Sequence, residues 1–584
     1  MNTLVIVLIA AVVLVCAYAG YGRWLAKTWG VDPNAKTPAV RLEDGKDYVP
    51  TNGWTVFAHQ FSSIAGAGPV TGAIQAAAFG WLPVLLWVLI GGVFFGAVTD
   101  FGALYASVKN DGKSMGLLIE KYIGKTGRKL FLLFCWLFCG IVIAAFADMV
   151  AGTFNAFDAE GAQVEAAFTN GAAGMVSIMF MVFAVVFGFI QKKFNFSGWR
   201  EAIIGIIFIV LSFAVGMNCP LVFGKAAWSY ITFVYIFFAA VLPMWMLKQP
   251  RDYMTTFMFG AMIAGAVIGL LVAHPTMNLP VFTGFSNAKL GTMFPILFVT
   301  VACGAVSGFH SLVSSGTSSK TVENEKDMLK VGYGAMVLES LLAVLALCVA
   351  GAAAAADGTP ASGTPFQIFS RGVAGFFEMF GVPVSIATVF MTMCVSALAL
   401  TSLDAVARIG RMSFQELFSV DDMEHAEGWR KLCCNVYFST FITLVFGFIL
   451  TQIGYANIWP LFGSANQLLS ALVLATLCVF LKVTGRNNKM LFPPLVIMLC
   501  VTFTALVQRL IAMVKAISAA ASTAIPAGET TWGAVFIANG LQLILAVLLI
   551  VLGLNIVFHS VKSYTTCDAP EAKDNATATA KANA

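Results

Sequence analysis

The 584-residue sequence predicts an all-α protein that crosses a membrane many times. Hydrophobic residues make up 59% of the chain, whereas charged residues make up 11%, roughly half of the share in a soluble protein. The mean hydropathy is +0.86, and apolar runs of about 20 residues, the length that spans a bilayer as a helix, recur along the chain. This composition excludes a soluble, disordered or nucleic-acid-binding protein and makes the lipid bilayer its surroundings.

Fifteen apolar runs are long enough to span the bilayer. They begin near Leu4, Trp54, Trp81, Leu130, Gly174, Glu201, Trp228, Met254, Thr292, Gly332, Phe377, Leu432, Asn457, Leu491 and Trp532. All but five of the 34 Lys and Arg residues fall in alternate loops; the exceptions are Lys225, Lys289, Arg371, Lys515 and, inside a run, Arg509. Because basic residues collect in cytoplasmic loops, we expect the N-terminus outside and the C-terminus inside.

The order of the runs predicts the organisation of the chain. Pro69 and Pro243 each interrupt the first run of a group of five, and these two runs start on opposite sides, which indicates two inverted repeats. Ala17–Ala19 resembles a signal-peptidase site, but basic residues follow the first run instead of preceding it, which favours a retained helix. The expected parts are an extra helix (1–22), a cytoplasmic loop (23–53), two repeats (54–218 and 226–404), a second cytoplasmic loop (405–431), four more helices (432–559) and a disordered cytoplasmic tail (560–584).

The second run contains the strongest sign of a site. Gly66, Ala67, Gly68 and Pro69 lie about 18 Å of helical rise from its start, near the middle of the bilayer. Proline removes a backbone donor and glycine weakens a helix, so we expect a broken helix with free carbonyl and amide groups. The alternative is a packing kink between small residues. The polar residues around the interruption, which include Ser62 and Ser63, favour a site.

Ionisable and hydroxyl residues suggest where an ion could be coupled. Acidic groups are costly inside a membrane, and five titratable residues at similar depth could form a cluster near an inner gate: His59, Asp100, His310, Glu339 and Asp404. Glu339 lies deepest and is the best candidate for a proton. Pairing of Asp100 or Asp404 with Lys109 or Arg408 is the alternative.

A row of serines follows His310 at helical spacing and includes Ser311, Ser314 and Ser315. These hydroxyls could bind a sodium ion, or could hydrogen-bond between helices. The cysteines are scattered, with no His spaced to join them, so we expect no bound metal.

Six stretches of the sequence closely resemble the carbon starvation protein A (CstA) family. They are HQFSSIAGAGPVTG (59–72), WLPVLLWVLIGGVFFGAVTDF (81–101), VLPMWMLKQPRDY (241–253), SGFHSLVSSGTSSK (307–320), ALTSLDAVARIGR (399–411) and FGSANQLLSAL (462–472). The resemblance implies a secondary transporter of the amino acid-polyamine-cation superfamily in the bacterial inner membrane, with a leucine-transporter-like fold and no cofactor. It also implies uptake of peptides or pyruvate during carbon starvation, with proton coupling preferred to sodium coupling.

On this resemblance, the substrate would lie between the interruptions at Gly66–Pro69 and at Leu242–Pro243. The amino ends of half-helices there would face its carboxylate. An ion channel and a membrane sensor are the less favoured functions. Peptide versus pyruvate and the oligomeric state stay open at this point.

Overall fold

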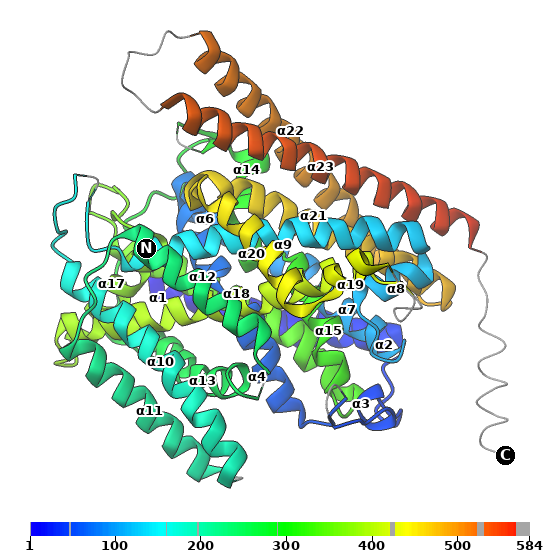
Figure 1. The fold of residues 1–584 in the computed structure, drawn as a ribbon, viewed down its shortest axis with the longest axis horizontal. Helices are drawn as coiled ribbons and strands as arrows, with labels where there is room; N and C mark the ends of the chain where they lie inside the picture. Colours follow the sequence, from blue (N-terminus) through cyan, green and yellow to red (C-terminus); the bar gives the residue numbers. More distant parts are fainter. Residues whose placement is uncertain are drawn as a thin grey trace.

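The computed structural model describes residues 2–45, 48–158, 160–194, 198–243, 245–288, 290–420, 427–522 and 531–567. These residues form a bundle of helices (Figure 1), and the described strands are a short antiparallel pair, β1 (Ser286–Asn287) and β2 (Gly291–Thr292). The prediction of an all-α membrane protein is confirmed at this level.

The helices follow the apolar runs closely. The first part of the chain forms α1 (Thr3–Ala17), α2 (Arg23–Trp29), α3 (Pro38–Arg41), α4 (Gly53–Ile64), α5 (Ala67–Ala76), α6 (Trp81–Gly91), α7 (Ala97–Val108), α8 (Met115–Tyr122), α9 (Lys125–Phe154), α10 (Ala167–Phe194), α11 (Trp199–Asn218), α12 (Lys225–Val241) and α13 (Lys248–Ala273). The second part forms α14 (Met293–Val301), α15 (Gly308–Gly316), α16 (Ala335–Ala353), α17 (Pro365–Glu378), α18 (Val384–Phe418), α19 (Gly428–Cys434), α20 (Val436–Thr451), α21 (Tyr455–Val483), α22 (Phe492–Ser522) and α23 (Thr531–Thr566).

Twelve helical stretches in the described part of the chain are long and apolar enough to cross a membrane, when consecutive helices such as α1–α2, α6–α7 and α14–α15 are counted together. The bent pair α19–α20 raises the number to up to 13. The two remaining predicted spans coincide with α4–α5 and with α12, which are shorter. The protein is therefore a multi-pass membrane protein, whereas the full count of fifteen spans stays a prediction.

Burial separates the central helices from those at the edge. The apolar windows of α21 and α9 are 100% and 83% buried inside the protein, whereas that of α11 is 17% buried. α9 packs against α18 and α21 in the centre. Figure 1 shows α22 and α23 side by side along one edge and α10 beside α11 at the opposite edge. The central helices are the ones that hold the candidate site described below.

Two predicted loop boundaries differ from the structure. α18 continues to Phe418, so the loop expected from residue 405 begins later. α23 continues to Thr566, so the tail expected from residue 560 begins as helix. In both places the apolar helix continues past the end of its hydrophobic run, because its backbone hydrogen bonds do not depend on apolar side chains. The tail from residue 568 lies outside the described residues.

Candidate functional site

The first helix break lies between α4 and α5, at the predicted place. α4 ends at Ile64 and α5 begins at Ala67, so the backbone leaves helical geometry over two residues. Gly66 approaches α18 so closely that a Cβ atom there would overlap Ser402 Oγ. No described side chain caps the amino end of α5. Its backbone N–H groups are therefore available to an acceptor.

A second break lies between α14 and α15. α14 ends at Val301, a short 3-10 turn covers Ala302–Gly304, and α15 begins at Gly308. The sequence contains a weak signal of this break, because Gly304 and Gly308 flank Ser307 within an apolar run. Without a proline, that signal did not distinguish the break from ordinary small-residue packing.

The prediction that Pro243 breaks a span is wrong. Pro243 is exposed and lies after the end of α12, where a helix has no further N–H to lose. Arginines of α18 hold this end: Arg408 Nη2 donates to Leu242 O at 2.8 Å, and Arg411 Nη1 donates to Ala240 O at 3.0 Å. Leu242 and Pro243 therefore lie at the connection between α12 and α13. The bounds expected for the two repeats, 54–218 and 226–404, both depend on this misplaced break, and the proposal below gives them other bounds.

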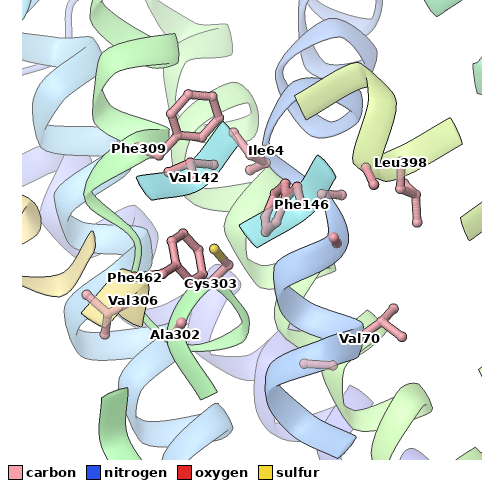
Figure 2. Packing of buried hydrophobic residues seen from close by; sticks show 14 of the residues in the cluster. Ile64, Val70, Val142, Phe146, Ala302, Cys303, Val306, Phe309, Leu398 and Phe462 are labelled. Carbon is pink, nitrogen blue, oxygen red and sulfur yellow. The ribbon is translucent and has the colours of Figure 1, made fainter. Parts of the chain in front are cut away.

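The two observed breaks meet in the centre of the protein. A Cβ atom at Gly68 would overlap Cys303 Sγ, and one at Gly304 would lie 3.5 Å from Pro69 Cα. Figure 2 shows Phe146, Phe309 and Phe462 near Cys303. The cavity at this junction has room for about one water molecule in this conformation. Its lining residues are Ile64, Gly66, Gly68, Phe138, Val142, Phe146, Cys303, Phe309, Ser402, Val406, Phe462 and Asn466.

The predicted substrate residues are only partly at this cavity. Gly66 and Gly68 line it, whereas Ser62, Ser63, Ala67 and Pro69 are buried in the same segment without lining it. Polar groups outside the predicted set of substrate residues complete the lining: Ser402, Asn466 and Cys303. Ser402 and Asn466 lie in two of the family-like stretches, and a polar residue inside an apolar run was the available signal.

Three of the five predicted ionisable residues form a cluster. His310 Nδ1 lies 3.0 Å from Asp100 Oδ2, and His310 Nε2 lies 3.3 Å from Glu339 Oε2. All three side chains are fully buried, and they come from α7, α15 and α16. Asp100 Oδ1 and both oxygens of Glu339 have no hydrogen-bond partner among the described residues. We call Asp100, His310 and Glu339 the buried triad.

Asp404 is not part of the buried triad. Its partner is Arg251 Nη1 of α13, and the Tyr235 hydroxyl also donates to Asp404 Oδ2 at 2.8 Å. Arg251 is 2% exposed and also pairs with Asp252 at 2.8 Å. The charge pattern placed Arg251 in a cytoplasmic loop, but α13 begins before it and carries it into the protein.

The alternative pairings expected for Asp100 and Asp404 are also wrong. Lys109 Nζ pairs with Glu325 at 2.6 Å instead of with Asp100. The hydrogen bonds of Arg408 Nη2 go to carbonyl oxygens at the end of α12 instead of to Asp404. His59 is exposed on α4, and its electrostatic interactions are with Asp252 and Lys248 of α13. It therefore lies apart from the buried triad.

The hydroxyls of the predicted serine row make hydrogen bonds to a neighbouring helix and to backbone carbonyl oxygens of their own helix. Gln60 of α4 donates to Ser314 Oγ at 2.8 Å and accepts from Ser318 Oγ at 2.6 Å. Ser311 Oγ donates to Gly308 O, and Ser315 Oγ donates to Ser311 O. Within the described residues, no group of three or more His, Cys, Asp or Glu side chains is arranged to hold a metal ion.

Comparisons with known proteins cover most of this chain. The family model described as carbon starvation protein CstA matches residues 2–359 and 352–505. A peptide transporter CstA of Escherichia coli is 32% identical over 86% of this chain and 80% of its own length, and one of Bacillus subtilis is 30% identical over 84% and 87%. A pyruvate/proton symporter BtsT of Escherichia coli is 36% identical over 60% of this chain and 49% of its own length. Among solved structures, a manganese transporter from Eremococcus coleocola aligns with 89% of this chain and 99% of its own, at 11% identity and a TM-score of 0.46.

Proposed function

Because this chain belongs to the carbon starvation protein CstA family, we propose that it imports small carboxylate-bearing nutrients across the bacterial inner membrane by alternating access. The curated relatives that it matches are transporters and not enzymes. The observation that carries this proposal is the meeting of two broken helices at one small cavity. The uncapped amino end of α5 supplies N–H groups and a positive helix-dipole end for a carboxylate. Peptides and pyruvate, the solutes in the names of the relatives, both carry one.

The repeats are part of this proposal. The first would comprise α4–α5, α6–α7, α9, α12 and α13, and the second α14–α15, α16, α18, α20 and α21. Short helices, α8 and α17, follow the second member of each series. The fourth members, α12 and α20, have similar lengths of 17 and 16 residues, and the third members, α9 and α18, pack together. The hairpin α10–α11 is then an insertion in the first repeat.

Proton coupling through the buried triad is the second part of the proposal. Two fully buried carboxylates are costly when both are charged, so burial of the triad favours bound protons. The triad has no net charge when it consists of one imidazolium, one carboxylate and one neutral carboxyl group. His310 lies in the first turn of α15, directly after the cavity residue Phe309. The turn that contacts the cavity therefore also carries His310 of the triad, which would link substrate and proton binding.

Counterflow in liposomes tests the transport proposal. We expect the purified protein to exchange labelled pyruvate or labelled dialanine, and excess unlabelled solute of the same kind to suppress the signal. Gly68→Val should abolish exchange because its side chain would overlap Cys303, whereas Gly260→Val should preserve it because nothing lies within 4 Å of that position. Absence of exchange of both solutes by folded protein would contradict the proposal.

A further inference from the structure

Asn466 has an unusual position for a neutral polar side chain. It lies in α21, is fully buried and lines the cavity at the second helix break. Its amide group makes hydrogen bonds with residues inside that break and in the first turn of α15. A buried amide of this kind normally satisfies all of its strong hydrogen-bonding groups.

The oxygen of Asn466 holds the beginning of α15. Asn466 Oδ1 accepts from the backbone N–H of Phe309 at 3.2 Å and from Ser307 Oγ at 3.2 Å. It therefore caps the amino end of α15 from a neighbouring helix, in the place that a capping side chain of the same helix would otherwise take. Phe309 lines the cavity, and His310 of the buried triad follows it.

The nitrogen of Asn466 has a much weaker partner. Asn466 Nδ2 donates to Cys303 Sγ at 3.3 Å, and a thiol sulfur is a poor acceptor. Any carbonyl oxygen in the cavity would be a better acceptor. The exchange of one acceptor for another would leave the cap on α15 intact, because that cap uses the other end of the amide.

We propose that Asn466 is the specificity-determining donor of the substrate site, whose Nδ2 group binds a carbonyl oxygen of the substrate beside the carboxylate. Pyruvate offers its keto oxygen and a dipeptide offers its peptide oxygen. A neutral amide binds this oxygen without repelling the carboxylate or forming an ion pair with it. The carboxylate itself would bind at the amino end of α5. The assignment rests on the transport function proposed above. It also places one side chain between the substrate and the turn that holds His310.

Asn466→Asp separates recognition from a merely structural role. The carboxylate retains an oxygen that accepts from Phe309 and Ser307, so the cap on α15 survives. The substitution removes the donor and adds a negative charge near the substrate carboxylate. Loss of a hydrogen bond to an acceptor of this kind predicts a KM for exchange that rises by about tenfold or more in the folded protein. The buried carboxylate also lowers the melting temperature. An unchanged KM would overturn the assignment.

Ser464→Ala is the matched control on the same helix, because the Ser464 hydroxyl donates to Pro460 O of α21 and Ser464 does not line the cavity. Its KM should equal that of the unaltered protein. If the unaltered protein exchanges neither pyruvate nor dialanine, the transport proposal itself fails. Exchange with the same KM in Asn466→Asp would remove only the role of Asn466.

A second pair of variants keeps the test independent of the folding of Asn466→Asp. Cys303→Ser places a stronger acceptor against Asn466 Nδ2, whereas Cys303→Ala removes the acceptor. If the substrate competes for this donor, KM should be higher in Cys303→Ser than in Cys303→Ala, for pyruvate and dialanine alike. Equal values or the reverse order would overturn the proposal.

Discussion

At the residue scale, the partners of the buried carboxylates separate two kinds of site. Glu339 is fully buried and has no hydrogen-bond partner among the described residues, while His310 lies 3.3 Å away. Asp404, in contrast, is neutralised by Arg251. A carboxyl group without a permanent counter-ion is suited to gain and lose a proton, whereas an ion pair is suited to hold helices together.

Glu339→Gln tests the first of these roles. The glutamine cannot release a proton, so we expect substrate to exchange between equal pools but no longer to accumulate under an inward proton gradient. Asp148→Asn is the control, since Asp148 is a buried carboxylate that pairs with Lys225 at 2.7 Å away from the triad. Accumulation in liposomes by Glu339→Gln at the level of the control would contradict proton binding at this residue.

Arg251→Met tests the second role. It leaves Asp404 and Asp252 as unpaired buried charges, and loss of one partner of a buried pair destabilises by about 3–5 kcal/mol. We expect a large fall in the melting temperature in detergent and a partial recovery when Asp404→Leu is added. A single variant as stable as the unaltered protein would show that this pair contributes little.

The composition of the triad was only partly predictable. Depth along each helix placed His59, Asp100, His310, Glu339 and Asp404 near one another, and depth can be read from sequence position. The direction in which each side chain points depends on how the helices rotate and pack, and a single sequence does not contain that information. Packing turns Asp404 towards α13 and leaves His59 exposed on α4.

At the element scale, the first break depends on close contact with α18. A Cβ atom at Gly66 would overlap Ser402 Oγ, so glycine and a small partner are both required there. The break is therefore a packed feature between two helices. It is also the place where the amino end of α5 reaches the cavity.

Gly66→Ala should destabilise the protein by about 1–3 kcal/mol, the usual range for an extra methyl group in a filled core. Removal of the Ser402 hydroxyl in Gly66→Ala/Ser402→Ala should restore most of the loss, because that oxygen is the nearest atom to the added methyl group. Melting temperatures of the two single variants and the double variant form the cycle. Additive losses in the double variant would contradict this contact.

The two prolines show how far an element can be read from sequence. Pro69 follows glycines in the middle of an apolar run, and the break near it is present. Pro243 has a similar apolar context but lies just after the end of α12. Arginines of α18 donate hydrogen bonds to the last carbonyl oxygens there and so stabilise this helix end. The true second break lacks proline altogether. Tertiary contacts decided between these outcomes.

At the scale of the whole molecule, the buried helices α9, α18 and α21 form a frame around the two broken helices. Composition and the apolar runs were sufficient to predict a multi-pass helical protein, since the hydrophobic thickness of a membrane constrains helix length strongly. The frame and its cavity result from contacts between distant segments. In the transport cycle that we propose, movement of the broken helices against the frame opens the cavity to each side in turn.

The most direct test of the central claim is uptake by the unaltered protein in liposomes under an inward proton gradient and, separately, under an inward sodium gradient at equal pH. Coupling through the buried triad predicts that labelled pyruvate or dialanine accumulates above its external concentration with the proton gradient alone. It also predicts that a proton ionophore abolishes this accumulation. Accumulation driven by sodium at equal pH, or uptake that ignores both gradients, would contradict the account.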